Sequence, residues 1–173
     1  LTCTCAKRPA DDTSCCEAAA FGFDAVELFA PNPEAIAMAE VKDIVAKHGI
    51  ALAAVGTGAG MVIDGLSLSD PDDEARARAC NFVRSMIWYG AEAGVPAIIG
   101  SMQGKVAERE SGLDRLAESL IELDAVAQEA AVPLLLEPLS RYETNLVNTL
   151  SDAMGLIERC GTKNLRIMAD LFH

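Results

Sequence analysis

The sequence predicts a single α/β domain, residues 1–173, in which a parallel β-sheet is covered by helices. Short β-like runs alternate with longer helical patterns along the whole chain, as in repeated strand-helix units. The run at residues 133–137 is apolar until its last residue, which is typical of a parallel strand buried on both faces. The 173 residues are 51% hydrophobic and 23% charged, as expected for one globular domain.

Each expected strand is a short run bounded by turn or polar residues. The first is an alternation of Thr and Cys, and the others are rich in Ala, Val, Leu and Ile. The third leads into the glycine-rich segment 56–60, which we expect to be a flexible loop. The six expected strands are residues 1–6, 25–29, 50–55, 96–99, 133–137 and 165–169.

Start and stop signals delimit the helices between these strands. After a turn at residues 31–33, a helical pattern ends at the basic Lys47 and His48 before Gly49, the usual helix stop. We therefore assign His48 to compensation of the helix dipole rather than to a site. The segment 69–74 combines a cap residue, a proline and clustered acids, and it predicts a helix running to about Ala93.

The clearest amphipathic helix follows the fourth strand. Its apolar residues recur at helical spacing along one stripe, with acidic residues on the opposite face. The stripe consists of Leu113, Leu116, Leu120, Leu123 and Ala127. A further helix is expected at residues 148–160, where Gly161 stops it.

Charge and cysteine usage exclude several classes of function. The 26 acidic residues outnumber the 14 basic ones, and a net charge of −12 disfavours binding to nucleic acid or to an anionic membrane. The six cysteines form no Cys-x-x-Cys pair, so we expect free thiols. With no apolar run near the roughly 20 residues of a membrane span and no signal-peptide pattern, we expect a cytoplasmic protein with a small-molecule ligand.

Acidic residues and a histidine lie at the ends of the expected strands. In parallel α/β folds ligands bind at the carboxyl ends of strands, where Glu27, Glu137, Asp170 and His173 are placed. Carboxylates and imidazole suit a divalent cation such as Mn²⁺ or Mg²⁺. Glu27 is equally well explained as a solvated or helix-capping residue, whereas Glu137 is followed by a dense polar stretch, residues 140–145, typical of a binding loop.

The glycine-rich segments do not match nucleotide-binding motifs. The spacing of Gly56, Gly58 and Gly60 differs from the dinucleotide fingerprint, and residues 100–105 are one residue short of a Walker loop. The acidic segment 70–74 lacks the pattern of a calcium loop. The segments 56–61 and 101–105 are instead expected to line a pocket.

Three stretches together carry a resemblance to a known family. Residues 23–28 (FDAVEL), 136–145 (LEPLSRYETN) and 169–173 (ADLFH) resemble the sugar phosphate isomerase/epimerase superfamily, the xylose isomerase-like barrels. Within it, the sequence is most similar to the D-tagatose and D-psicose 3-epimerase branch. The resemblance implies a parallel (β/α)₈ TIM barrel, of which residues 1–173 hold about six strand-helix units, truncated before strands seven and eight.

The resemblance also implies roles for individual residues. Glu137 would be both a metal ligand and a catalytic acid/base, and Asp170 a second metal ligand. Glu143 and His173 would contact hydroxyl groups of the sugar. The cofactor would be a divalent metal, foremost Mn²⁺, with Mg²⁺ or Co²⁺ as alternatives. The remaining ligands and the second acid/base carboxylate would lie beyond residue 173, so the truncated chain is expected to be inactive or impaired.

The predicted activity is that of a metal-dependent sugar isomerase or epimerase. A ketose 3-epimerase would abstract the proton beside the carbonyl and pass through a metal-stabilised enediolate. Alternatives on the same barrel are an inosose dehydratase or a hydroxypyruvate isomerase, and from another class a non-catalytic sugar-binding remnant. A related AP endonuclease is disfavoured because it would need a basic groove. The identity of the sugar and any homo-oligomer are left open.

Overall fold

The computed structural model describes residues 2–5 and 12–173, which contain one six-stranded sheet. All neighbouring strands pair in parallel, and they follow one another in chain order across the sheet. The predicted parallel α/β sheet is therefore confirmed. The strands are β1 (Thr2–Cys5), β2 (Ala25–Phe29), β3 (Ala51–Gly56), β4 (Ala97–Ile99), β5 (Leu134–Leu136) and β6 (Leu165–Ile167).

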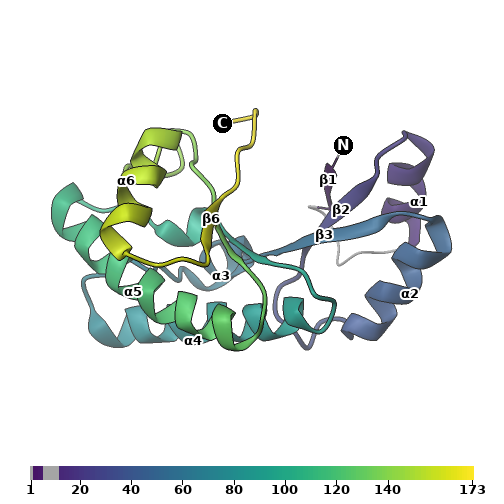
Figure 1. Ribbon diagram of the computed structural model, residues 1–173, viewed down its shortest axis with the longest axis horizontal. Coiled ribbons are helices and arrows are strands. Elements are labelled where there is room, and N and C mark those ends of the chain that lie inside the picture. Colours follow the sequence, from purple (N-terminus) through teal and green to yellow (C-terminus); the bar gives the residue numbers. More distant parts are fainter. Residues whose placement is uncertain (1, 6–11) are drawn as a thin grey trace.

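Helices connect successive strands and lie along one side of the curved sheet (Figure 1). Sequential parallel strands with helices outside them are the arrangement of a TIM barrel. In Figure 1, the C-terminal segment after β6 lies on the side of the sheet opposite to α4 and α5. The main helices are α1 (Asp12–Ala20), α2 (Met38–His48), α4 (Asp73–Ala91), α5 (Arg109–Glu129) and α6 (Leu150–Cys160).

The core lies between these helices and the sheet. The predicted stripe of α5 faces inward, because Leu116, Leu120 and Leu123 are each 0% exposed. They pack in one cluster with strand residues such as Leu134 and Leu136. The helical spacing of apolar residues therefore identified the buried face correctly.

Local signals account for most helix ends. The side chain of Asp72 caps α4 by accepting from the backbone N–H of Ala75 at 2.7 Å. Thr149 and Asp152 form a reciprocal capping box at the start of α6. Gly49 ends α2 at φ 68°, in the left-handed conformation that glycine adopts without a steric penalty.

One expectation about the fold was wrong. The segment after β3 is not simply a flexible loop, because Gly58–Asp64 forms a helix, α3. A Cβ atom on Gly60 would lie 2.7 Å from two ring atoms of Phe82, so this glycine permits close packing. A short 3₁₀ helix, η1 (Ser101–Gln103), similarly follows β4. Both insertions lie at the carboxyl edge of the sheet.

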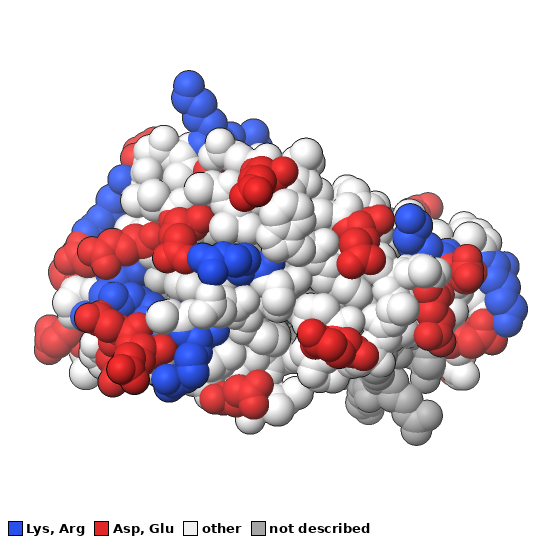
Figure 2. All heavy atoms as spheres, turned by 90° about the horizontal axis from the view of Figure 1, so that it is seen from below, with Lys and Arg blue, Asp and Glu red and all other residues white. Residues whose placement is uncertain are grey.

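The charge and cysteine expectations can be compared with the described residues. On the face seen from below relative to Figure 1, basic side chains are interspersed with acidic ones (Figure 2). Cys15, Cys16, Cys80 and Cys160 are free thiols, whereas the side chains of Cys3 and Cys5 lie outside the described residues. No helix within residues 12–173 is long and apolar enough to cross a bilayer.

Candidate metal and sugar site

A cavity of about 390 Å³ opens at the carboxyl ends of the strands. This is the edge at which parallel α/β folds bind ligands. The four residues predicted for the site, Glu137, Glu143, Asp170 and His173, all line it. The other lining residues are Glu27, Leu28, Phe29, Gly56, Thr57, Gly58, Ile98, Gly100, Ser101, Leu139 and Phe172.

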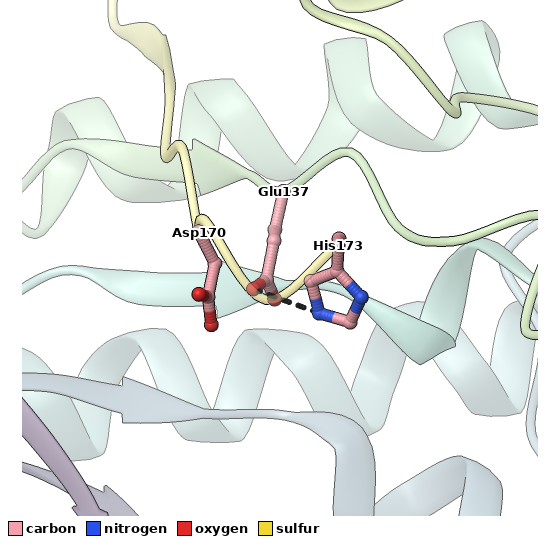
Figure 3. A group of neighbouring side chains, drawn as sticks. All are labelled: Glu137, Asp170 and His173. Atoms are coloured by element: carbon pink, nitrogen blue, oxygen red, sulfur yellow. Dashed lines mark ion pairs between the residues drawn. The ribbon is translucent and has the colours of Figure 1, made fainter.

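Three of the lining side chains form a compact group of metal-ligand type. One donor atom from each of Glu137, Asp170 and His173 lies within 4.8 Å of the others. Figure 3 shows Glu137 extending from the end of β5, with Asp170 and His173 on the segment after β6. The Nε2 atom of His173 is 3.5 Å from Oε1 of Glu137, and the two side chains are only 11% and 13% exposed.

Backbone hydrogen bonds fix the position of Glu137. Its N–H donates to the carbonyl of Ile99 at 3.0 Å, which continues the ladder between β5 and β4. Its own carbonyl accepts from the Nε2 atom of the buried Gln103 at 2.7 Å. The residue is therefore held at both backbone polar groups while its side chain enters the cavity.

A turn after β6 brings Asp170 and His173 together. The Oδ1 atom of Asp170 accepts from the N–H of Phe172 at 2.8 Å, which is the hydrogen bond of an Asx turn. The N–H of His173 donates to the carbonyl of Asp170 at 3.3 Å. This reversal of the chain returns the imidazole towards Glu137, which the sequence spacing alone did not indicate.

The site disfavours the ionised form of Glu137. Burial raises the pKa of its carboxyl from 4.5 to about 7, and the negative charges of Asp170, Glu27 and Glu143 add to this effect. His173 acts in the opposite direction. A cation held beside Glu137 would favour its ionised form.

His173 is placed between two carboxylates. Its Nδ1 atom is 3.0 Å from Oε2 of Glu143, opposite the contact of Nε2 with Glu137. Ser140 supports this arrangement, since its hydroxyl donates to Oε2 of Glu143 at 2.8 Å and its N–H to Nδ1 of His173 at 3.3 Å. A sugar hydroxyl entering the cavity would meet both hydrogen-bond donors and acceptors.

The donor set fits a divalent cation. Two carboxylates and one imidazole match the ligands that Mn²⁺ takes in proteins, and burial together with nearby negative charges disfavours the ionised form of Glu137. Glu137, Asp170 and His173 would hold the ion. The residue types at the strand ends placed His173 in a donor set for a divalent cation, and the family resemblance implied a sugar contact; in the structure one of its nitrogens lies within 4.8 Å of the donor atoms of Glu137 and Asp170. Glu27 also lines the cavity, and its charge acts on Glu137.

Two residues that support Glu137 were not recognised in the sequence. Gln103 and Gly100 lie in the turn after β4, and both approach Glu137. The expectation that the segments 56–61 and 101–105 line a pocket is confirmed for Gly56, Thr57, Gly58 and Ser101 in this cavity. Gly100 and Gln103 come close to Glu137 because β4 pairs with β5, and no local sequence motif predicts that pairing.

The fold and the position of the site define a member of the xylose isomerase-like TIM barrels. Residues 16–173 match the model of that family, and the chain belongs to it. The predicted barrel type and superfamily are thus confirmed.

Curated relatives are named as sugar epimerases. The chain is 28% identical over 165 residues to the D-psicose 3-epimerase of Ruminiclostridium cellulolyticum. The aligned region covers 90% of this chain and 55% of that protein. It is 26% identical over 157 residues to the L-ribulose 3-epimerase of Mesorhizobium japonicum, covering 88% and 52%. The chain thus spans about half the length of these relatives.

Solved structures agree with this assignment. The D-psicose 3-epimerase with D-tagatose from Clostridium cellulolyticum superposes with a TM-score of 0.82 at 25% identity, covering 99% of this chain and 63% of that one. The L-ribulose 3-epimerase structure has a TM-score of 0.80 at 22% identity, covering 100% and 61%, and it supports the fold alone.

Proposed function

We propose that this chain forms part of a divalent-metal-dependent ketose 3-epimerase. The observation that carries the proposal is the buried carboxylate of Glu137, grouped with Asp170 and His173 within 4.8 Å at the carboxyl edge of the sheet. The names of the relatives support the same sugar chemistry. Mn²⁺ is the proposed metal, with Mg²⁺ or Co²⁺ as alternatives.

The side chains that line the cavity have different roles in the proposed reaction. A bound cation would polarise the carbonyl of the sugar and make the neighbouring C–H more acidic. Glu137 then removes the proton from that carbon, since its carboxylate extends into the cavity. Glu143 and His173, which contact each other at 3.0 Å, orient the adjacent hydroxyls. Inversion also requires a proton donor on the opposite face of the sugar.

Positioning and proton affinity both favour Glu137 as the base. A general base must be ionised to accept a proton, and a cation beside Glu137 would favour the ionised form that burial disfavours. Its backbone is fixed by Ile99 and Gln103, which limits the motion of the carboxylate. Asp170 is exposed and therefore better suited to holding the ion than to moving a proton.

A 4-epimerase is the second candidate. The chain is 36% identical over 58 residues, 34% of its length, to the 3-dehydro-D-guloside 4-epimerase of Escherichia coli. A 4-epimerase of a keto-sugar can use the same proton abstraction beside a carbonyl. The substrate class therefore distinguishes the two candidates better than the cavity does.

The test is a substrate panel with the natural full-length protein. Free ketoses and 3-keto-glycosides are incubated with Mn²⁺, and with EDTA as the control, and the products are separated by chromatography. We expect C3-epimerised ketoses that require the metal. Turnover of 3-keto-glycosides alone would favour the second candidate. Full activity in EDTA after removal of bound metal would contradict the metal-dependent mechanism.

A further inference from the structure

The turn after β4 bears directly on the geometry of Glu137. A Cβ atom built on Gly100 would lie 2.7 Å from Oε2 of Glu137, closer than nonbonded carbon and oxygen atoms approach. The other atoms near that position are Cδ2 of Leu139 at 3.7 Å and Cδ of Glu137 at 3.8 Å, which are ordinary contacts. One carboxylate oxygen of Glu137 therefore occupies the space that a side chain at position 100 would need.

We propose that Gly100 is a positioning residue of the site, which sets where the carboxylate of Glu137 lies by leaving space for it. The inference rests on the proposed function, because it concerns the same carboxylate. It adds a residue that supplies neither a proton nor a ligand atom, because glycine has no side chain. Any larger residue at position 100 would push the carboxylate out of the place it now occupies.

The neighbouring Gln103 strengthens this assignment. Its N–H donates to the carbonyl of Gly100 at 3.0 Å, and its side-chain Nε2 donates to the carbonyl of Glu137 at 2.7 Å. Gln103 is 0% exposed, and the two hydrogen bonds that it donates connect the ends of β4 and β5. The turn therefore fixes the backbone of Glu137 through Gln103 and leaves room for its carboxylate at Gly100.

The predicted effect of a side chain at position 100 is selective. The only contact shorter than 3.4 Å involves the far end of a flexible side chain, so the carboxylate moves while the backbone stays. Gly90 provides the contrast, because a Cβ atom there would meet the backbone carbonyl of Val95 at 2.7 Å. Gly100→Ala should consequently change the site and spare the fold.

The experiment measures Mn²⁺ affinity by calorimetry and thermal unfolding for the natural full-length protein and its variants. Since changes to residues that orient metal ligands typically cost about 10- to 100-fold in metal affinity or activity, we expect Gly100→Ala to weaken Mn²⁺ binding about tenfold or more. Its Tm without metal should stay close to that of the parent, because the carboxylate can move while the backbone stays.

Gly155→Ala is the matched control. Gly155 lies within α6, and a Cβ atom there would have no neighbour within 4 Å. This substitution has the same effect on side-chain size and on the unfolded chain, without reaching the site. Mn²⁺ affinity and epimerase activity should equal those of the parent.

The same substitution in a Glu137→Asp variant tests whether the carboxylate of Glu137 causes the loss of Mn²⁺ affinity. Glu137→Asp shortens the side chain by one methylene, which withdraws the carboxylate from Gly100. In the Glu137→Asp background we expect Gly100→Ala to change Mn²⁺ affinity less than about twofold, because the two substitutions are coupled through one contact. If Gly100→Ala alone fails to fold, recovery of folding in this background supports the proposal, and no recovery overturns it.

The outcomes separate the two proposals. Parent-like Mn²⁺ affinity in Gly100→Ala, with a parent protein that binds Mn²⁺ and a Glu137→Gln variant that does not, overturns the role of Gly100 alone. An equal loss from Gly100→Ala in both backgrounds also overturns it. A parent protein that neither binds Mn²⁺ nor epimerises any sugar overturns the proposed function, and the positioning role with it.

Discussion

Two regions of the molecule surround their buried side chains differently: the interface between α5 and the sheet, and the carboxyl edge of the sheet. Along α5, the buried Leu116, Leu120 and Leu123 pack against other apolar residues of the same chain. At the carboxyl edge, the side chain of Glu137 is 13% exposed, and burial raises its pKa most, with a further contribution from the negative charges of Asp170, Glu27 and Glu143. The helix interface thus stabilises the fold, whereas the strand ends group carboxylates that disfavour one another's ionised forms.

The contrast teaches where stability and function reside in this molecule. Apolar burial is non-directional and contributes to folding wherever the stripe of a helix meets the sheet. A buried carboxylate opposes folding unless a partner compensates its charge. Substitutions at the α5 interface should therefore lower stability, whereas substitutions at the carboxyl edge should weaken ligand binding.

The largest effect on stability is expected from the helix interface. Leu120→Ala removes a fully buried side chain from the core cluster and should lower the free energy of unfolding by about 2–5 kcal/mol. Chemical denaturation measures this value. The folded fraction should retain parent-like Mn²⁺ affinity, and a specific loss of metal binding without a loss of stability would break the comparison.

A smaller effect is expected from pH at the carboxyl edge. The pKa of Glu137 is raised from 4.5 to about 7, so the folded state keeps a proton that the unfolded chain has released. The contribution of this group to stability is therefore greatest below about pH 4.5 and is lost as the pH rises to about 7. Mn²⁺ competes with the same proton and should bind more tightly as the pH rises towards 7.

Thermal unfolding with and without Mn²⁺ at pH 5.5 and pH 8 measures this linkage. We expect a larger rise in Tm from Mn²⁺ at pH 8, where Glu137 is ionised, than at pH 5.5. Glu137→Gln, which cannot ionise at that position, is the control and should reduce the difference. Equal stabilisation at the two pH values would show that Glu137 does not bind the ion.

Much of the fold could be predicted from sequence because its signals are local. Helical spacing identified the buried face of α5, and Gly49 marked the end of α2. The helix α3 was missed because Gly58 and Gly60 indicate flexibility in isolation. Gly58 lies against Phe29 and Ser101, and Gly60 lies against Phe82 and Met102, and these contacts become visible only in three dimensions.

The site was predicted only in part for the same reason. Glu137 and Asp170 stand at polarity changes after apolar strands, which a sequence can show. The contact of His173 with Glu137 depends on the Asx turn at Asp170, and the approach of Gly100 depends on the pairing of β4 with β5. Such contacts join residues that are distant in the chain, so no spacing rule identifies them.

The most direct test of the central claim is solvent exchange at the substrate carbon beside the carbonyl. The natural full-length protein with Mn²⁺ is incubated with its ketose in deuterium oxide, and NMR follows incorporation of deuterium at that carbon. We predict exchange by the parent protein and a loss of about 100-fold or more in Glu137→Gln, with the fold retained. Exchange at the parent rate in Glu137→Gln would contradict the assignment of Glu137 as the base.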